Sequence, residues 1–81
     1  MIILSESQRN SIQSYILVGK IDDFLEEAER ILEQEGDDVK DALSFAEKEK
    51  NRLSECEDWE NYDEMAIVVM ILKNSSLNPN A

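Results

Sequence analysis

The chain has 81 residues, and its 19 acidic residues outnumber its 8 basic residues to give a formal net charge of −11. With 42% hydrophobic residues it is too apolar to be wholly disordered, and its length allows one domain with a small core. One cysteine and no histidine exclude an internal disulfide and the common zinc-ligand sets, and the acidity argues against direct nucleic-acid binding.

A first helix is predicted to begin near residue 6, because Ser5 and Gln8 have the spacing of a capping box. Its second half has apolar residues at intervals of three and four, the pattern of an amphipathic helix: Leu17, Ile21, Phe24, Leu25, Ala28, Ile31 and Leu32. Gly19 can kink or divide this helix. Gly36 predicts its end, since glycine readily takes the left-handed conformation that closes helices.

A second amphipathic helix is predicted after the turn at Gly36, with Asp37 and Asp38 as candidate N-caps. Its apolar positions are Val39, Ala42, Leu43, Ala46, Leu53 and Cys56. Because the turn is short, we expect the first two helices to lie antiparallel as a hairpin.

A third helix is expected to start at Asp58 or Asn61. Its inner face takes Trp59, Tyr62, Ala66 and Val69. Residues 66–72 are apolar almost all round, which predicts that this helix is the most buried. The run also contains several β-branched residues, so a short strand at 65–72 in an α+β fold is left open as an alternative.

The predicted fold class is all-α, either a small three-helix bundle or a helical hairpin plus a third buried helix. We expect a single domain over residues 1–73 and a disordered tail over 74–81, where serine, asparagine and proline gather. Residues 1–4 lack the features of a signal peptide, and the run at 65–72 is less than half a membrane span. The expectation is a cytoplasmic protein without membrane contact.

Catalytic chemistry is not expected. Without histidine there is no imidazole base, and the sequence has no glycine-rich phosphate loop. The acidic residues between Asp58 and Glu64 lack the central glycine and regular spacing of a calcium loop. We therefore expect that the protein is not an enzyme and that it has no cofactor and no metal site.

The acidic residues are concentrated in one part of the chain. Between Asp22 and Glu64, 18 acidic residues and five basic ones give a formal charge of −13. Like charges recur at i,i+4 in the first helix, as Asp22/Glu26, Asp23/Glu27 and Glu29/Glu33, where each pair destabilises the helix by roughly 0.2–0.5 kcal/mol. Since helix stability does not favour this pattern, it indicates a continuous acidic face that binds a basic protein. A solvated surface without further function is the simpler interpretation.

The candidate partner-binding residues combine this face with two nearby aromatic residues: Asp22, Asp23, Glu26, Glu27, Glu29, Glu33, Asp37, Asp38, Trp59 and Tyr62. This combination is typical of an interface, because the aromatic side chains supply a large contact area and the acidic side chains attract a basic partner over a long range. The spacing of Trp59 and Tyr62 also fits the edge of a helical core.

Two functional hypotheses follow. The first is a small acidic inhibitor, of the immunity or phage-encoded antagonist type, that docks on a basic surface of a nuclease or nucleic-acid-binding protein. Its carboxylates would stand where phosphates bind, as in phosphate mimicry. The alternative is a helical adaptor or secretion-type chaperone that binds a partner helix through its apolar stripe. Self-association into a homodimer is also left open.

Overall fold

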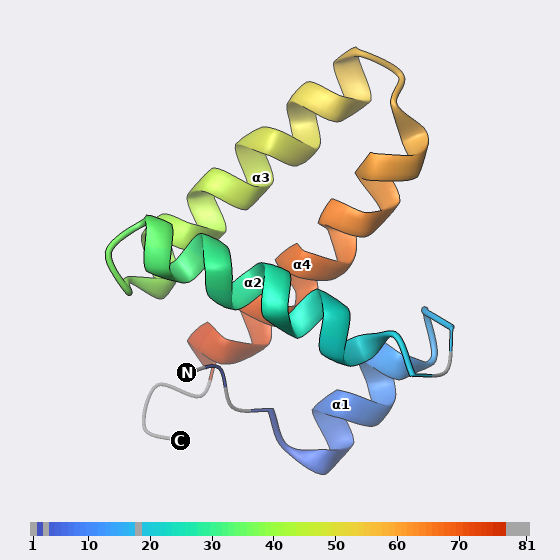
Figure 1. Ribbon diagram of the computed structural model, residues 1–81, viewed down its shortest axis with the longest axis vertical. Helices are drawn as coiled ribbons and strands as arrows, with labels where there is room; N and C mark the ends of the chain where they lie inside the picture. Colours follow the sequence, from blue (N-terminus) through green and yellow to red (C-terminus); the bar gives the residue numbers. More distant parts are fainter. Residues whose placement is uncertain (1, 3, 18, 78–81) are drawn as a thin grey trace.

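The computed structural model describes residues 2, 4–17 and 19–77, and this part of the chain forms four helices and no strand (Figure 1). The helices are α1 (Glu6–Gln13), α2 (Ile21–Gln34), α3 (Val39–Glu55) and α4 (Trp59–Leu77). The all-α prediction is confirmed. The alternative of a strand at 65–72 is wrong, because these residues lie within α4.

The predicted first helix is divided into α1 and α2, which is why there are four helices instead of three. The capping box is present: the Ser5 hydroxyl accepts the N–H of Gln8 at 3.1 Å, and the Ser5 N–H donates to the Gln8 side chain at 2.8 Å. α1 ends at Gln13, whose side-chain amide donates to the Leu17 carbonyl at 2.9 Å. Gly19 then takes φ +86°. Leu17, predicted in the apolar stripe, therefore lies in the connection and is 76% exposed.

The turn after α2 is formed by Gly36, as predicted. The N–H of Gly36 donates to the Glu33 carbonyl at 3.3 Å, and the N–H of Asp37 donates to the Leu32 carbonyl at 2.8 Å. These two bonds define a Schellman motif, which requires a left-handed residue after the helix. Gly36 supplies it with φ +83°.

α3 and α4 form the most extensive helix pair, and α2 crosses this hairpin (Figure 1). The main core combines residues of all four helices with Ile2: Ile12, Ile21, Ala28, Ile31, Leu32, Ala42, Ala46, Ile67, Val68, Val69, Ile71 and Leu72. Because α4 buries consecutive residues, it packs against neighbours on several sides, as predicted for the third helix.

α4 begins directly after Asp58, one of its two predicted start residues. The Asp58 carbonyl accepts the N–H of Tyr62 at 2.9 Å, and its carboxylate accepts the side-chain amide of Asn61 at 2.8 Å. The helix continues to Leu77, so the first part of the tail expected at 74–81 is helical. Residues 78–81 lie outside the described residues. Within the described part, no helix is both long and apolar enough to cross a membrane.

The end of the hairpin where α3 turns into α4 extends beyond α1 and α2 (Figure 1). α2 and the connection that precedes it therefore cover only part of the hairpin. The molecule is flat, with extents of 36 × 30 × 17 Å. This arrangement leaves a recess between α2 and the first turns of α4.

Candidate protein-binding cleft

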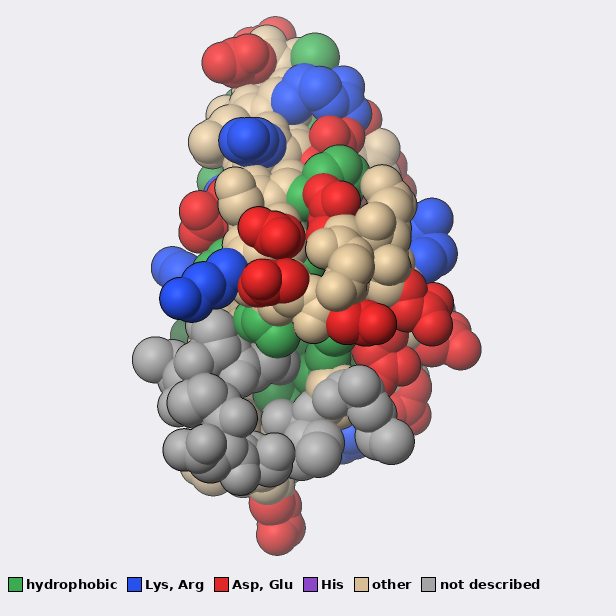
Figure 2. Space-filling view, turned by 90° about the vertical axis from the view of Figure 1, so that its left-hand side faces the viewer, with side chains coloured by type: hydrophobic (Ala, Val, Ile, Leu, Met, Phe, Trp, Pro, Cys, Tyr) green, Lys and Arg blue, Asp and Glu red, His purple; other side chains and the backbone are tan. Residues whose placement is uncertain are grey.

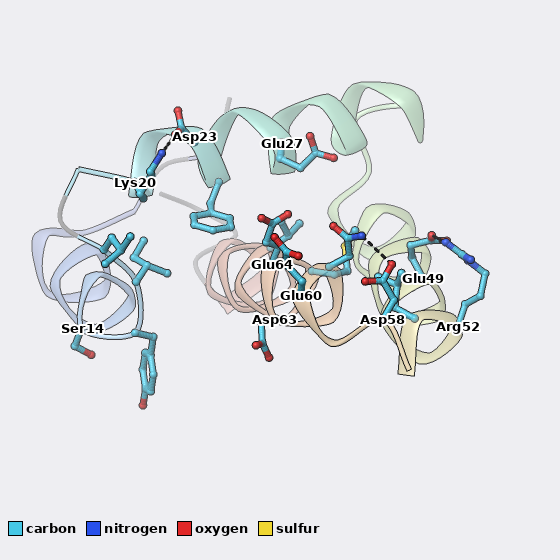
Figure 3. A pocket seen from close by; sticks show the side chains of 18 residues that line it. Ser14, Lys20, Asp23, Glu27, Glu49, Arg52, Asp58, Glu60, Asp63 and Glu64 are labelled. Carbon is cyan, nitrogen blue, oxygen red and sulfur yellow. Dashed lines mark hydrogen bonds and ion pairs between the residues drawn. The ribbon is translucent and has the colours of Figure 1, made fainter. Parts of the chain in front are cut away.

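A cleft of about 1160 Å³ lies between α2, the α1–α2 connection and the α3–α4 hairpin (Figure 3). Its described lining consists of Ser14, Tyr15, Ile16, Leu17, Lys20, Asp23, Phe24, Glu27, Glu49, Arg52, Leu53, Asp58, Glu60, Asn61, Asp63, Glu64, Met65 and Val68. Seven of these residues are acidic and two are basic, which gives a formal charge of −5. The cleft therefore concentrates almost half of the net charge of the chain in one recess.

Acidic side chains line the cleft on two sides. We call Asp23 and Glu27 the α2 wall, and Glu60 and Glu64 the α4 wall. Glu60 and Glu64 are directed from α4 toward α2, where Glu27 lies opposite (Figure 3). Within the described residues, neither Glu60 nor Glu64 takes part in an ion pair. They are also one turn apart on the same helix, so they repel each other. The α4 wall is the part of the cleft where negative charge is least compensated.

The bottom of the cleft is apolar. Leu53 and Val68 are buried there, and Phe24 and Met65 are partly buried beside them. Leu17 stands at the margin and is largely exposed. An acidic recess with an apolar bottom can attract a cationic ligand and also bury apolar groups of that ligand.

Several α2 carboxylates already have partners. Asp22 accepts from Arg9 of α1 at 2.7 Å, and Asp23 lies 3.7 Å from the ammonium group of Lys20. Glu27 forms an ion pair with Arg30, and the side-chain hydrogen bond within this pair raises the pKa of Arg30. These contacts partly neutralise the face that the sequence marked as unbalanced.

The remaining acidic candidates of α2, and Asp37 of the turn after it, line a second, smaller groove along the helix. This groove has a volume of about 710 Å³ and includes Glu26, Glu29, Glu33 and Asp37, together with Asp23 and Glu27. The Glu29 carboxylate also accepts the N–H of Ile2 at 3.1 Å. The two grooves share Asp23 and Glu27, so α2 separates two acidic recesses.

Asp38 has a structural role. Its carboxylate accepts the N–H of Lys40 at 2.9 Å and caps α3, as the sequence predicted. It lines neither of the two grooves on α2. The structure therefore separates Asp38 from the acidic side chains that were expected to act with it.

Trp59 and Tyr62 lie at the start of α4 but do not line the cleft. Their rings make an edge contact, with centroids 5.4 Å apart and planes at 78°. The Lys50 ammonium group lies 6.0 Å from the centre of the Tyr62 ring. Trp59 remains 54% exposed at the end of the hairpin. The two aromatic candidates are thus close to each other but form a surface separate from the cleft.

The acidic surface is not uniform. Figure 2 shows one face of the molecule, on which acidic side chains form separate groups with lysine and arginine side chains between them. Four ion pairs contribute to this mixture in the described part of the chain. No group of three or more cysteine, aspartate or glutamate side chains there is arranged to hold a metal ion.

Sequence reasoning missed Glu60 and Glu64 as site residues. The available signal was their i,i+4 spacing, the same like-charge pattern that marked the α2 candidates. What the sequence did not show is that α4 turns this pair toward α2. Comparisons with protein-family models, with curated proteins and with solved structures gave no match.

Proposed function

We propose that this protein acts by binding a basic protein partner, and that the cleft between α2 and α4 is the binding surface. The observation that carries the proposal is the orientation of Glu60 and Glu64 toward Glu27, without an ion pair to either α4 carboxylate in the described residues. Holding the like charges of Glu60 and Glu64 one turn apart on α4 costs free energy, and a bound cationic side chain offsets that cost. Binding a basic partner therefore relieves a repulsion that is built into the free protein.

An inhibitory role is the use that best fits this chemistry. Proteins that handle nucleic acids bind phosphates through lysine and arginine side chains. A carboxylate-lined cleft competes for the same side chains and repels the nucleic acid itself. We therefore propose an antagonist of a nuclease or nucleic-acid-binding protein, which acts by covering a basic surface and needs no catalytic group.

The adaptor or chaperone alternative has less support. It requires the apolar stripe of the first two helices to be available to a partner helix. In α2 four residues of that stripe are buried in the core: Ile21, Ala28, Ile31 and Leu32. A partner could reach them only after the bundle opened.

The test is affinity capture from the native host followed by affinity measurement with the purified partner. We expect a basic partner whose affinity falls at least about tenfold between about 50 mM and 500 mM salt, because the contacts are charged and exposed. The double substitution Glu60→Gln and Glu64→Gln removes the α4 wall at nearly constant shape. It should weaken binding by a similar factor.

The matched control is Asp41→Asn with Glu55→Gln, which removes two exposed acidic groups outside the cleft. It should leave affinity within about twofold of the original protein, since distant exposed charges are screened. Excess duplex DNA should displace an inhibitor of the proposed kind from its partner. If both double variants bind equally well, or if the partner binds without salt dependence, the proposed function is wrong.

A further inference from the structure

We infer that the cleft receives one amphipathic helix of the partner, with its apolar side inward and basic side chains on its flanks. This inference rests on the proposed function and specifies the form of the partner. Three properties of the cleft support it: an apolar bottom, acidic walls on two sides, and a volume that accommodates a short helix.

The apolar bottom requires more than a charged ligand. Phe24 and Met65 are partly buried and open into the cleft, and Leu17 is 76% exposed at its margin. A flexible polycation would leave these groups in contact with water. A helix with apolar residues at intervals of three and four presents a continuous apolar stripe that covers them.

The acidic walls match the flanks of such a helix. On α2, Asp23 and Glu27 are four residues apart, and on α4 the same interval separates Glu60 and Glu64. Four residues of α-helix rise by roughly 6 Å, so each wall presents two carboxylates about one turn apart. Lysine or arginine residues at i and i+4 of a bound helix have the same spacing. The α4 pair can meet such a flank directly, whereas a basic side chain at the α2 pair competes with Lys20 and Arg30.

The size of the cleft fits a short helical segment. A helix with its side chains is about 10–12 Å wide, so 1160 Å³ corresponds to about two turns. An extended peptide that adds to a sheet edge is not supported, because the described residues contain no strand. A second copy of this chain is disfavoured as the occupant, because its net charge of −11 meets a cleft of the same sign.

The test uses a synthetic peptide of about 14 residues, with leucines at intervals of three and four and lysines elsewhere. A scrambled peptide of the same composition is the control. We expect the amphipathic peptide to bind the full-length protein at least about tenfold more tightly, because only it can bury its leucines together. Calorimetry measures the affinities, and amide chemical shifts should change in α2 and in the first half of α4.

Two variants locate the peptide. Leu17→Ser should weaken binding about fivefold or more, because it removes exposed apolar surface at the margin of the cleft. Trp59→Ser removes a larger exposed apolar side chain outside the cleft and should leave the affinity unchanged. Since both residues are exposed, thermal unfolding should confirm that each variant remains folded.

The outcomes separate the inference from the proposed function. If the scrambled peptide binds equally well and both peptides bind more weakly to the Glu60→Gln and Glu64→Gln variant, the helical inference is overturned and the proposed function stands. If neither peptide responds to that variant, both fail. Loss of binding in Trp59→Ser but not in Leu17→Ser would place the ligand at the hairpin end and overturn the inference.

Discussion

Glu49 and Arg52 form an ion pair at the α3 side of the cleft. The side-chain hydrogen bond from Arg52 lowers the pKa of Glu49, and the same bond raises the pKa of Arg52. The two residues are three positions apart on α3, a spacing that places their side chains next to each other on the helix surface. Because Arg52 is already engaged with Glu49, it offsets the acidity of the α3 side and leaves the α4 carboxylates as the main unpaired charges.

The residue-scale prediction concerns Arg52→Gln. Loss of the hydrogen bond should raise the pKa of Glu49 toward the ordinary value for glutamate, which carboxyl NMR titration can measure. A lowered pKa stabilises the fold above the pKa of the unfolded chain, and this stabilisation is lost as the pH falls through the folded-state pKa. The variant should therefore be less stable than the original protein near neutral pH, with the difference vanishing in acid.

Arg30→Gln is the matched control for this experiment, since Arg30 pairs with Glu27 on α2. It should leave the titration of Glu49 unchanged. An unchanged Glu49 pKa in Arg52→Gln would show that the pair does not persist in solution.

At the scale of the helices, α2 and α3 end in the same motif with different residues. After α3, the N–H of Glu57 donates to the Ser54 carbonyl at 3.1 Å, and the N–H of Asp58 donates to the Leu53 carbonyl at 2.9 Å. Glu57 has φ +57° in the position that Gly36 occupies after α2. A left-handed conformation costs an L-residue about 1 kcal/mol or more, whereas glycine accepts it freely. The turn that positions the α4 wall is therefore strained.

Opposite substitutions at these two turns should have opposite effects. Gly36→Ala should lower stability by about 1 kcal/mol, because a Cβ there meets no atom within 4 Å and the cost is backbone strain alone. Glu57→Gly should raise stability by up to about 1 kcal/mol, because it removes the backbone strain. The greater entropy of glycine in the unfolded chain reduces this gain. These changes correspond to shifts of roughly 4–8 °C per kcal/mol in thermal unfolding.

Glu57→Gln is the control, because it removes the charge and keeps the left-handed strain. It should stabilise the protein less than Glu57→Gly does. If the two substitutions raise stability equally, the negative charge of Glu57, and not its backbone conformation, is what lowers the stability of the protein at this turn.

At the scale of the whole molecule, repulsion among carboxylates opposes folding. The chain carries a net charge of −11, and the described residues contain four ion pairs, all of them between exposed or partly exposed side chains. Exposed pairs contribute little to stability, while a large net charge destabilises the compact state. Repulsion among the carboxylates therefore outweighs the ion pairs, so salt that screens these charges should stabilise the fold.

We expect the thermal unfolding midpoint to rise as NaCl increases from about 10 mM to about 300 mM, a range over which the Debye length falls from about 30 Å to below 8 Å. Calorimetry or circular dichroism can follow the transition. The rise should be smaller in the Asp41→Asn and Glu55→Gln variant, which carries two fewer negative charges. A midpoint that falls with salt would mean that the ion pairs outweigh the repulsion.

The sequence by itself determined the helical class, the cap at Ser5, the turn at Gly36 and the burial of most of residues 66–72. Each of these features depends on residues close together in the chain: a side chain bonding a backbone group three residues away, a glycine after a helix, or an unbroken apolar run. Such interactions can be inferred without knowledge of the tertiary arrangement. The acidic net charge of the chain also follows from composition, but the choice of acidic residues that line the cleft does not.

Only the tertiary structure decided which carboxylates face one another. The pairing of Asp22 with Arg9 depends on how α1 packs beside α2, and the orientation of Glu60 and Glu64 toward α2 depends on how α2 crosses the hairpin. The exposure of Leu17 follows from the break between α1 and α2. These features depend on how distant apolar side chains fit together in the core, and local spacing does not encode that fit.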